Sequence, residues 1–196
     1  MEDKSLCSAS MAELENNKAR LKKQLKPNHV IHTLMCEHEV ILGYLCKLEE
    51  LNAAIQKMKS YDSKRDEFKM LVHIAEHLIE AEAHHEREEE VLFPELERRG
   101  VYGPPSVMRA EHIDLRQHKK ALLKLATQAS KLDFNTFKKD LAAETDFITT
   151  VLEEHIGKED GILYPMALEV IKDEGVWYEM KADCDKIGYC CFTPKG

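Results

Sequence analysis

Two stretches of the chain repeat one phrase, and this repeat constrains the fold more than any other feature. Residues 84–94 read HHEREEEVLFP and residues 155–165 read HIGKEDGILYP. When the prolines are aligned, His84 matches His155 and Glu88 matches Glu159. Residues four apart lie one above the other on a helix face. Each copy therefore predicts a helix that presents an imidazole and a carboxylate on the same side, and the alignment selects His84 rather than His85.

Two such helices facing each other predict a metal site in the interior of a helical bundle. They supply two imidazoles and two carboxylates that can bridge a pair of ions, as in the di-metal carboxylate sites of bundles. Two other helices need only add terminal imidazoles, and His38 and His112 each follow a glutamate. A chain with 36 acidic residues also contains such pairs by accident, on solvated faces. The repetition in matched contexts favours the metal site.

Apolar residues recur at helical spacing through four long stretches of the chain. The predicted helices cover 28–58, 65–99, 105–131 and 135–173, with Asn135 as the cap of the last one and Gly175 as its end. Pro94 and Pro165 should kink these helices or loosen their last turns. Short connections and no alternating strand pattern predict an all-α fold, an antiparallel up-and-down four-helix bundle.

The ends of the chain are expected to flank this bundle. Residues 1–27 are predicted to form an N-terminal extension with a short polar helix over 9–26. Residues 28–174 form the bundle, and 175–196 are expected to form a short helix and an ordered tail packed on it. A length of 196 residues suits one domain with a full core.

Composition narrows the classes of partner. A net charge of −8 argues against nucleic acid, because phosphate binding needs a basic face. No stretch approaches the roughly 18–20 apolar residues of a membrane span, and the charged N-terminus does not read as a signal peptide. A cytoplasmic protein is expected.

The six cysteines form no CxxC pair, so the usual structural zinc spacing is absent. Free thiols are expected, with Cys36 and Cys46 as small core residues. Cys184, Cys190 and Cys191 cluster near the C-terminus at a spacing that matches no ligand template.

The order His, HxxxE, His, HxxxE on four successive helices resembles the hemerythrin-like, or HHE cation-binding, family. The likeness covers about residues 30–170, and the phrases HHEREEEVLFPELERRG and IGYCCFTP are similar to a prokaryotic branch of undefined function. The resemblance implies a centre of two iron ions with an oxo or hydroxo bridge. It implies four terminal ligands and two bridging carboxylates, namely His38, His84, His112 and His155, and Glu88 and Glu159. Imidazole and carboxylate ligation also suits zinc or manganese, so iron rests on the resemblance.

The chain departs from the oxygen-carrying hemerythrins in two places. Those proteins place a fifth histidine where this chain has Arg116, and a His followed five residues later by Asp where this chain has His155 and Glu159. Without a fifth histidine both irons keep an open position. This suits NO binding, peroxide chemistry or redox sensing better than stable oxygen transport. The HxxxE form on both helices is also similar to proteins that repair iron centres.

Other residues near the pattern carry weaker expectations. His77 and Glu86 are outside candidates for a replacement ligand, and His77 is expected instead to line the approach to the site. His85 is expected to be exposed. Arg116 should pair with a ligand carboxylate or close the pocket, or else form a surface salt bridge. Ordinary polar or packing roles are expected for the remaining histidines, His29, His32, His73 and His118.

Three functions remain open at the level of sequence. The favoured one is a di-iron protein that binds or senses O2, NO or peroxide, with or without redox turnover. The alternative is a protein that stores or delivers iron or repairs iron centres. A metal-free interaction bundle is disfavoured, because buried unpaired carboxylates are costly. No residue pattern identifies a catalytic base, an electron donor or a partner protein.

Overall fold

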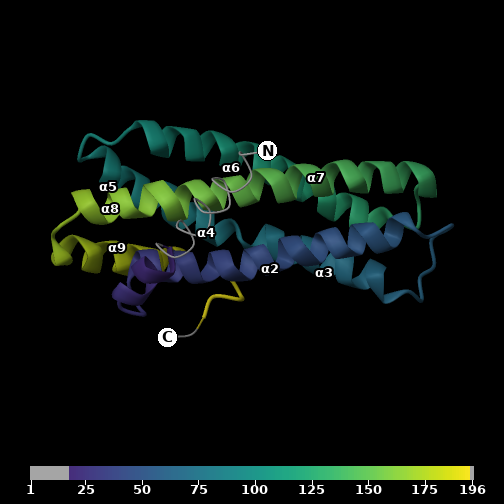
Figure 1. Ribbon diagram of the computed structural model, residues 1–196, viewed down its shortest axis with the longest axis horizontal. Helices are drawn as coiled ribbons and strands as arrows, with labels where there is room; N and C mark the ends of the chain where they lie inside the picture. Colours follow the sequence, from purple (N-terminus) through teal and green to yellow (C-terminus); the bar gives the residue numbers. More distant parts are fainter. Residues whose placement is uncertain (1–17, 195–196) are drawn as a thin grey trace, which may run out of the picture.

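In the computed structural model, which describes residues 18–194, long helical segments run the length of the molecule (Figure 1). The first bundle segment is helix α2 (Val30–Gln56) and the third is α6 (Gly103–Gln128). The second joins α3 (Asp66–Glu80), α4 (Glu82–Arg87), the π-helix η1 (Glu88–Leu92) and α5 (Phe93–Glu97). The fourth joins α7 (Phe134–Lys158), the π-helix η2 (Glu159–Leu163) and α8 (Tyr164–Val170). The described residues contain no strand, and the all-α prediction is confirmed.

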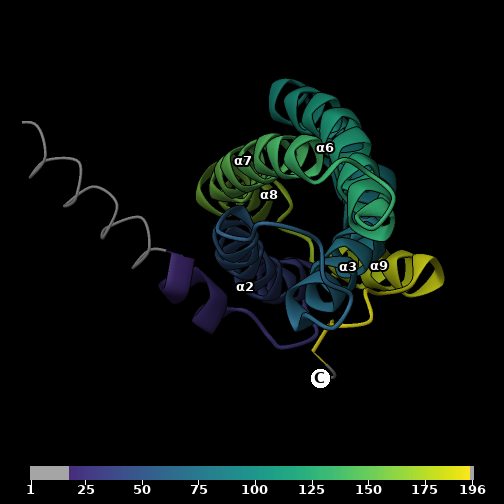
Figure 2. The same cartoon turned by 90° about the vertical axis from the view of Figure 1, so that its right-hand side faces the viewer.

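The four segments form a ring around one axis. Helix α2 packs on α3 and α7, and α6 packs on the same two helices. Figure 2 looks along the bundle and shows α9 (Glu174–Ile187) outside the ring, and α9 packs on α2, α4 and η1. Neighbouring segments run in opposite directions, because short connections join them in sequence order (Figure 1).

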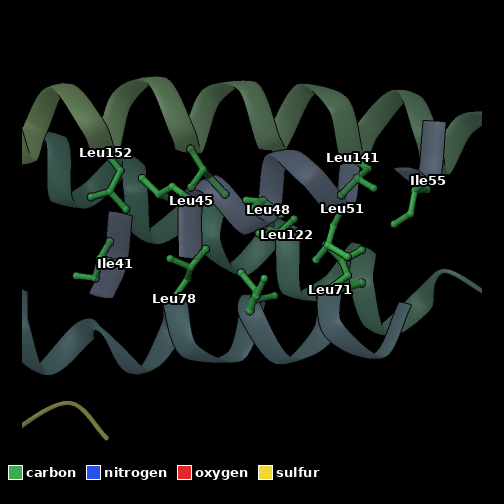
Figure 3. Packing of buried hydrophobic residues seen from close by; sticks show 14 of the residues in the cluster. Ile41, Leu45, Leu48, Leu51, Ile55, Leu71, Leu78, Leu122, Leu141 and Leu152 are labelled. Carbon is green, nitrogen blue, oxygen red and sulfur yellow. The ribbon is translucent and has the colours of Figure 1, made fainter. Parts of the chain in front are cut away.

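The apolar faces of these segments form two separate core clusters. One fills the half of the bundle around α3, where Leu48 of α2, Leu71 of α3 and Leu141 of α7 point toward one another (Figure 3). The other fills the half toward α5, α8 and α9, and includes Leu34, Phe93 and Trp177. Each fully buried leucine contributes about 1.5–3 kcal/mol to folding. In every bundle segment, a buried histidine lies near the point in the sequence where one cluster gives way to the other.

Each repeated phrase folds into a π-helix just before its proline. The backbone N–H of Phe93 donates to the Glu88 carbonyl, five residues back, and Tyr164 donates to Glu159 in the same way. Proline lacks an N–H, and its ring clashes with the carbonyl four residues back in an α-helix. A wider π turn relieves this clash. The predicted loosening at Pro94 and Pro165 therefore takes this form.

Two predicted boundaries of the fourth segment are wrong. Asp133, not Asn135, caps α7, because its carboxylate accepts the Thr136 N–H at 2.9 Å. The segment ends at Val170, and Gly175 lies in the first turn of α9 rather than at the end of the bundle helix. Asp173 caps α9 by accepting the Gly175 N–H at 2.8 Å, so a helix begins where a stop was expected.

Helix α9 and the residues after it fold back on the bundle. The Trp177 indole donates to the Ile171 carbonyl at 2.9 Å, and its ring packs at a tilt against His29, which caps α2. Gly188 has φ of 100° and turns the chain back toward α2 and α4. At the N-terminal end, residues 18–24 are helical, so the helix expected over 9–26 ends at residue 24. Its first part, 9–17, lies outside the described residues.

Within residues 18–194, no helix combines the length and the apolar character that crossing a bilayer requires.

Candidate metal centre

The six residues predicted as ligands meet in the middle of the bundle. His38 comes from α2, His84 from α4, His112 from α6 and His155 from α7. Glu88 and Glu159 are the first residues of the two π-helices. All six side chains are at most 2% exposed. The structure thus brings together every residue of the predicted set.

The four imidazoles are arranged as two pairs. His38 Nε2 lies 3.1 Å from His84 Nε2, and both residues belong to the first helical hairpin. His112 Nε2 lies 3.0 Å from His155 Nε2, and both belong to the second hairpin. Each hairpin therefore supplies one pair of nitrogens that face each other.

Each carboxylate lies between the two imidazole pairs. Glu88 Oε2 is 3.6 Å from His84 Nε2 and 3.5 Å from His112 Nε2. Glu159 reaches both pairs through different oxygens, with Oε2 3.2 Å from His38 Nε2 and Oε1 3.0 Å from His155 Nε2. A carboxylate so placed can bridge two cations, one at each imidazole pair.

The outward nitrogen of every imidazole is held by a further carboxylate. In the first pair, His38 Nδ1 lies 2.9 Å from Asp160 and His84 Nδ1 lies 2.7 Å from Glu37. The second pair repeats this pattern, with Nδ1 of His112 2.7 Å from Glu89 and Nδ1 of His155 2.8 Å from Glu111. A carboxylate on Nδ1 fixes the proton there and turns the Nε2 lone pair inward, as metal-binding histidines require.

Basic side chains complete these outer contacts. Arg87 is buried and donates to both oxygens of Glu37 at 2.7 Å. Lys158, at the matching place in the second phrase, pairs with Glu111. Arg116 donates to Glu89 at 2.9 Å and also pairs with Glu82. Arg116 thus pairs with Glu89, the carboxylate that holds His112, and not with either central glutamate.

One tyrosine also reaches the centre. The Tyr164 hydroxyl donates to Glu88 Oε1 at 2.7 Å and lies 3.4 Å from His38 Nε2. Its counterpart in the first phrase is Phe93, which stacks on His112 at 6.0 Å and brings no polar group. The repeated phrase marked an aromatic residue here, but the hydroxyl contact depends on the tertiary fold.

Burial and the neighbouring charges shift the pKa values of the central groups. Burial raises the pKa of the Glu88 carboxyl well above its usual value, and the charge of Glu159 raises it further. Burial opposes charge on His38, but Asp160 and Glu159 outweigh it and raise the pKa of His38 to about 9. Both shifts favour a bound proton, and a metal that binds these groups would have to displace it.

The donor set fits metal ions. Both oxygens of Glu159 and Oε2 of Glu88 are buried without a hydrogen-bond partner in the described part of the chain. Paired Nε2 atoms at about 3 Å repel unless a proton or a cation lies beside them. Neutral imidazoles and carboxylates without thiolates suit iron, manganese or zinc.

Some expectations about neighbouring residues are corrected. His85 is 2% exposed and stacks on His112 at 3.9 Å, so the prediction of an exposed side chain is wrong. Adjacent residues on a helix point about 100° apart, so His84 can face α2 while His85 faces α6. Glu86 is exposed and does not reach the centre. Cys46 is exposed rather than a core residue, because its neighbour Leu45 occupies the buried face of α2.

His77 lies away from the centre, in a surface cluster with the C-terminal tail. Its Nδ1 is 3.0 Å from Glu80 and 3.7 Å from Cys191 Sγ, and its ring packs on Tyr44. The expected role along the approach to the site has no contact to support it. The remaining histidines make ordinary contacts, such as His118 with Glu144 at 2.7 Å.

The carboxylates that hold the histidines were not predicted as functional residues. Glu37 and Glu111 were noted only as neighbours of His38 and His112. Glu89 and Asp160 each follow one of the two central glutamates, and this repeated acidic position is the signal that could have identified them.

Comparison with known proteins agrees with this geometry. The family model described as Hemerythrin HHE cation binding domain matches residues 29–167, which contain all six central residues. A search of curated proteins finds no match. Because the family model covers most of the chain, and the chain's own buried His and Glu side chains meet at one centre, the chain belongs to the hemerythrin HHE cation-binding family.

Proposed function

We propose that this chain is a non-haem di-iron protein that binds or senses a small ligand such as O2, NO or peroxide. His38 and His84 would hold one iron, His112 and His155 the other, and Glu88 and Glu159 would bridge them. The single observation that carries the proposal is that each of the two carboxylates lies between two separate imidazole pairs. A bound di-iron centre would supply electron transfer and ligand binding at an open coordination position.

The protein's own contribution would be positioning and exclusion of water. The four outer carboxylates orient the imidazoles. The two apolar clusters flank the centre. The Tyr164 hydroxyl lies beside it as a hydrogen-bond donor. These groups would hold a small ligand in a dry pocket, where electrostatic interactions are strong.

Metal analysis with optical spectroscopy under nitrogen, air and NO tests this function. We expect two irons per chain and a visible spectrum of an oxo- or hydroxo-bridged pair that changes on adding NO. The double variant Glu88→Ala and Glu159→Ala should bring iron content close to zero. The matched control Glu86→Ala removes an exposed carboxylate two residues from Glu88 and should keep both irons.

The same measurements separate the alternatives. Reversible iron release without any spectral response to NO would replace ligand sensing with iron storage, delivery or repair. Purified protein that takes up no stoichiometric metal would leave only a helical interaction bundle.

A further inference from the structure

The two halves of the centre are related by the repeat, and the relation extends to the outer contacts. His84 matches His155, and the carboxylates on their Nδ1 atoms, Glu37 and Glu111, each precede the histidine of the neighbouring helix. The basic partners of these two carboxylates, Arg87 and Lys158, also occupy matching positions. Positions where the match fails can therefore make the two metal positions different.

His85 is the clearest failure of this match. Its counterpart in the second phrase is Ile156, a buried apolar residue of the core. His85 is buried as well, so burial is shared while the imidazole is present on one side only. The difference therefore changes the available ligands without changing the packing pattern.

The ring of His85 lies against the second imidazole pair. It stacks on His112 at 3.9 Å with an interplanar angle of 14° and lies 6.1 Å from His155, centroid to centroid. One potential ligand atom from each of His85, His112 and His155 fits within 4.8 Å of the others. The three nitrogens are close enough to share one cation once the His85 ring tilts out of its parallel stack on His112, because each imidazole donates its lone pair in the plane of its ring. Among the described residues, the corresponding group at the first imidazole pair consists of His38, His84 and Glu159, with no third imidazole.

Hydrogen bonding does not account for the burial of His85. Each of the other four imidazoles has a carboxylate within 2.9 Å of its Nδ1. The Nδ1 of His85 is buried without a hydrogen-bond partner among residues 18–194, and Glu82 is 3.8 Å away. The nearby Lys119 is also buried, and its Nζ has no partner in the same range. An uncompensated buried imidazole is unfavourable, so a cation that takes its lone pair would explain its place.

We propose that His85 is a third imidazole ligand of the metal held by His112 and His155. This inference rests on the proposed di-metal function. With three imidazoles and one oxygen from each bridging carboxylate, that metal would be saturated once a solvent bridge is added. The metal at His38 and His84 would keep the open position, because Ile156 offers it no donor. Arg116, at the position that supplies a fifth histidine in oxygen-carrying relatives, is turned to Glu89 and Glu82 instead.

The test uses the full chain loaded with ⁵⁷Fe and the substitution His85→Ile, which copies the residue of the second phrase. We expect wild-type protein to hold two irons with two distinct Mössbauer quadrupole doublets and to bind one azide per chain. In the variant, iron content should stay near two per chain, the two doublets should converge, and azide stoichiometry should rise from one to two. His73→Ile removes an exposed histidine from α3 and should leave all three measurements at wild-type values.

The outcomes distinguish this proposal from the function on which it depends. Two irons per chain with the same spectrum and azide stoichiometry in wild type and His85→Ile would overturn the ligand role of His85 and leave the di-iron centre intact. Failure of the wild type to bind two irons would overturn both proposals. If His85→Ile does not fold, the wild-type spectrum still decides, because equivalent irons would contradict the proposal. His85→Gln then repeats the comparison with a polar side chain.

Discussion

At the level of single residues, the centre depends on carboxylates that reach across to a neighbouring helix. Glu37 is next to His38 in sequence but points to His84, because adjacent residues on a helix face different directions. The same side chain neutralises the buried Arg87 and accepts from Thr193 in the tail. Glu37 therefore couples one ligand, one buried cation and the C-terminus.

Replacing Glu37 should weaken metal binding more than it disturbs the fold. In Glu37→Gln the amide cannot hold the proton on His84 Nδ1 as a carboxylate does, and loss of such a partner typically lowers metal affinity about 10- to 100-fold. Competition with a chromophoric chelator measures the affinity. Glu39→Gln, at a 57% exposed position of the same helix, is the control and should keep wild-type affinity. Equal affinities in the two variants would contradict the assigned role of Glu37.

At the level of elements, the π-helices set the direction of the central side chains. Each begins at one of the two central glutamates and ends before a proline, so the turn that carries Glu88 is rotated relative to the turn that carries Phe93. An inserted residue of this kind shifts the following side chains by about 100° compared with an α-helix. The helix before the bulge can thus face the centre while the helix after it packs into the apolar cluster.

Removing one residue from a π-helix should abolish this arrangement. We expect deletion of the exposed Glu90 to convert η1 to α-helical geometry and to turn His84 and Glu88 away from their partners. Metal content should fall to one ion per chain or fewer, while far-ultraviolet circular dichroism stays helical. The substitution Glu90→Ala keeps the chain length and should keep both metals. Full metal loading of the deletion variant would show that the bulge is dispensable.

Sequence reasoning predicted the segments, and the two HxxxE pairs, because both depend on spacing within one helix, whereas His38 and His112 came from their Glu–His context and the family resemblance. It failed where the answer depends on a neighbour. The burial of His85 requires knowing that α6 lies against α4, and the choice between Asp133 and Asn135 as a cap depends on local backbone geometry. The sequence also did not predict that the turns before Pro94 and Pro165 are π-helical, since a proline indicates that the helix is distorted but not how. The metal and ligand assigned to the centre stay predictions.

At the level of the whole molecule, a layer of buried polar residues divides the apolar interior in two. The cluster around α3 and the cluster around α9 pack on opposite sides of the histidines and glutamates. Buried charged groups are costly unless they are paired. Bound metal should therefore contribute directly to the stability of the folded chain.

Removing metal should lower the unfolding temperature. A ligand that binds only the folded state at 1,000 times its dissociation constant stabilises it by about 4 kcal/mol. Thermal unfolding should shift downward in chelator-treated protein and recover when metal is restored. Glu88→Ala with Glu159→Ala should show no shift on adding metal. Coincident transitions for metal-loaded and chelated wild type would contradict the energetic link.

The C-terminal tail should act as a cover over one side of this layer. Arg87 lies 4.7 Å from the Tyr189 ring, Cys190 is 5% exposed and Thr193 contacts Glu37. Truncation after Gly188 would expose the Glu37–Arg87 pair to water. We expect faster metal release to a chelator, measured by stopped flow, and little change in helical content. Tyr178→Ala, at a 78% exposed residue of α9, should release metal at the wild-type rate.

The pairing of imidazoles within hairpins has a consequence for how the site assembles during folding. Each hairpin supplies both imidazoles of one pair. The carboxylate that orients one ring of the pair comes from the other hairpin, Asp160 for His38 and Glu89 for His112. The chain is thus two half-sites that are chemically similar but incomplete when separate. Neither hairpin alone can therefore orient both of its imidazoles, so the site is complete only after the two hairpins have packed together.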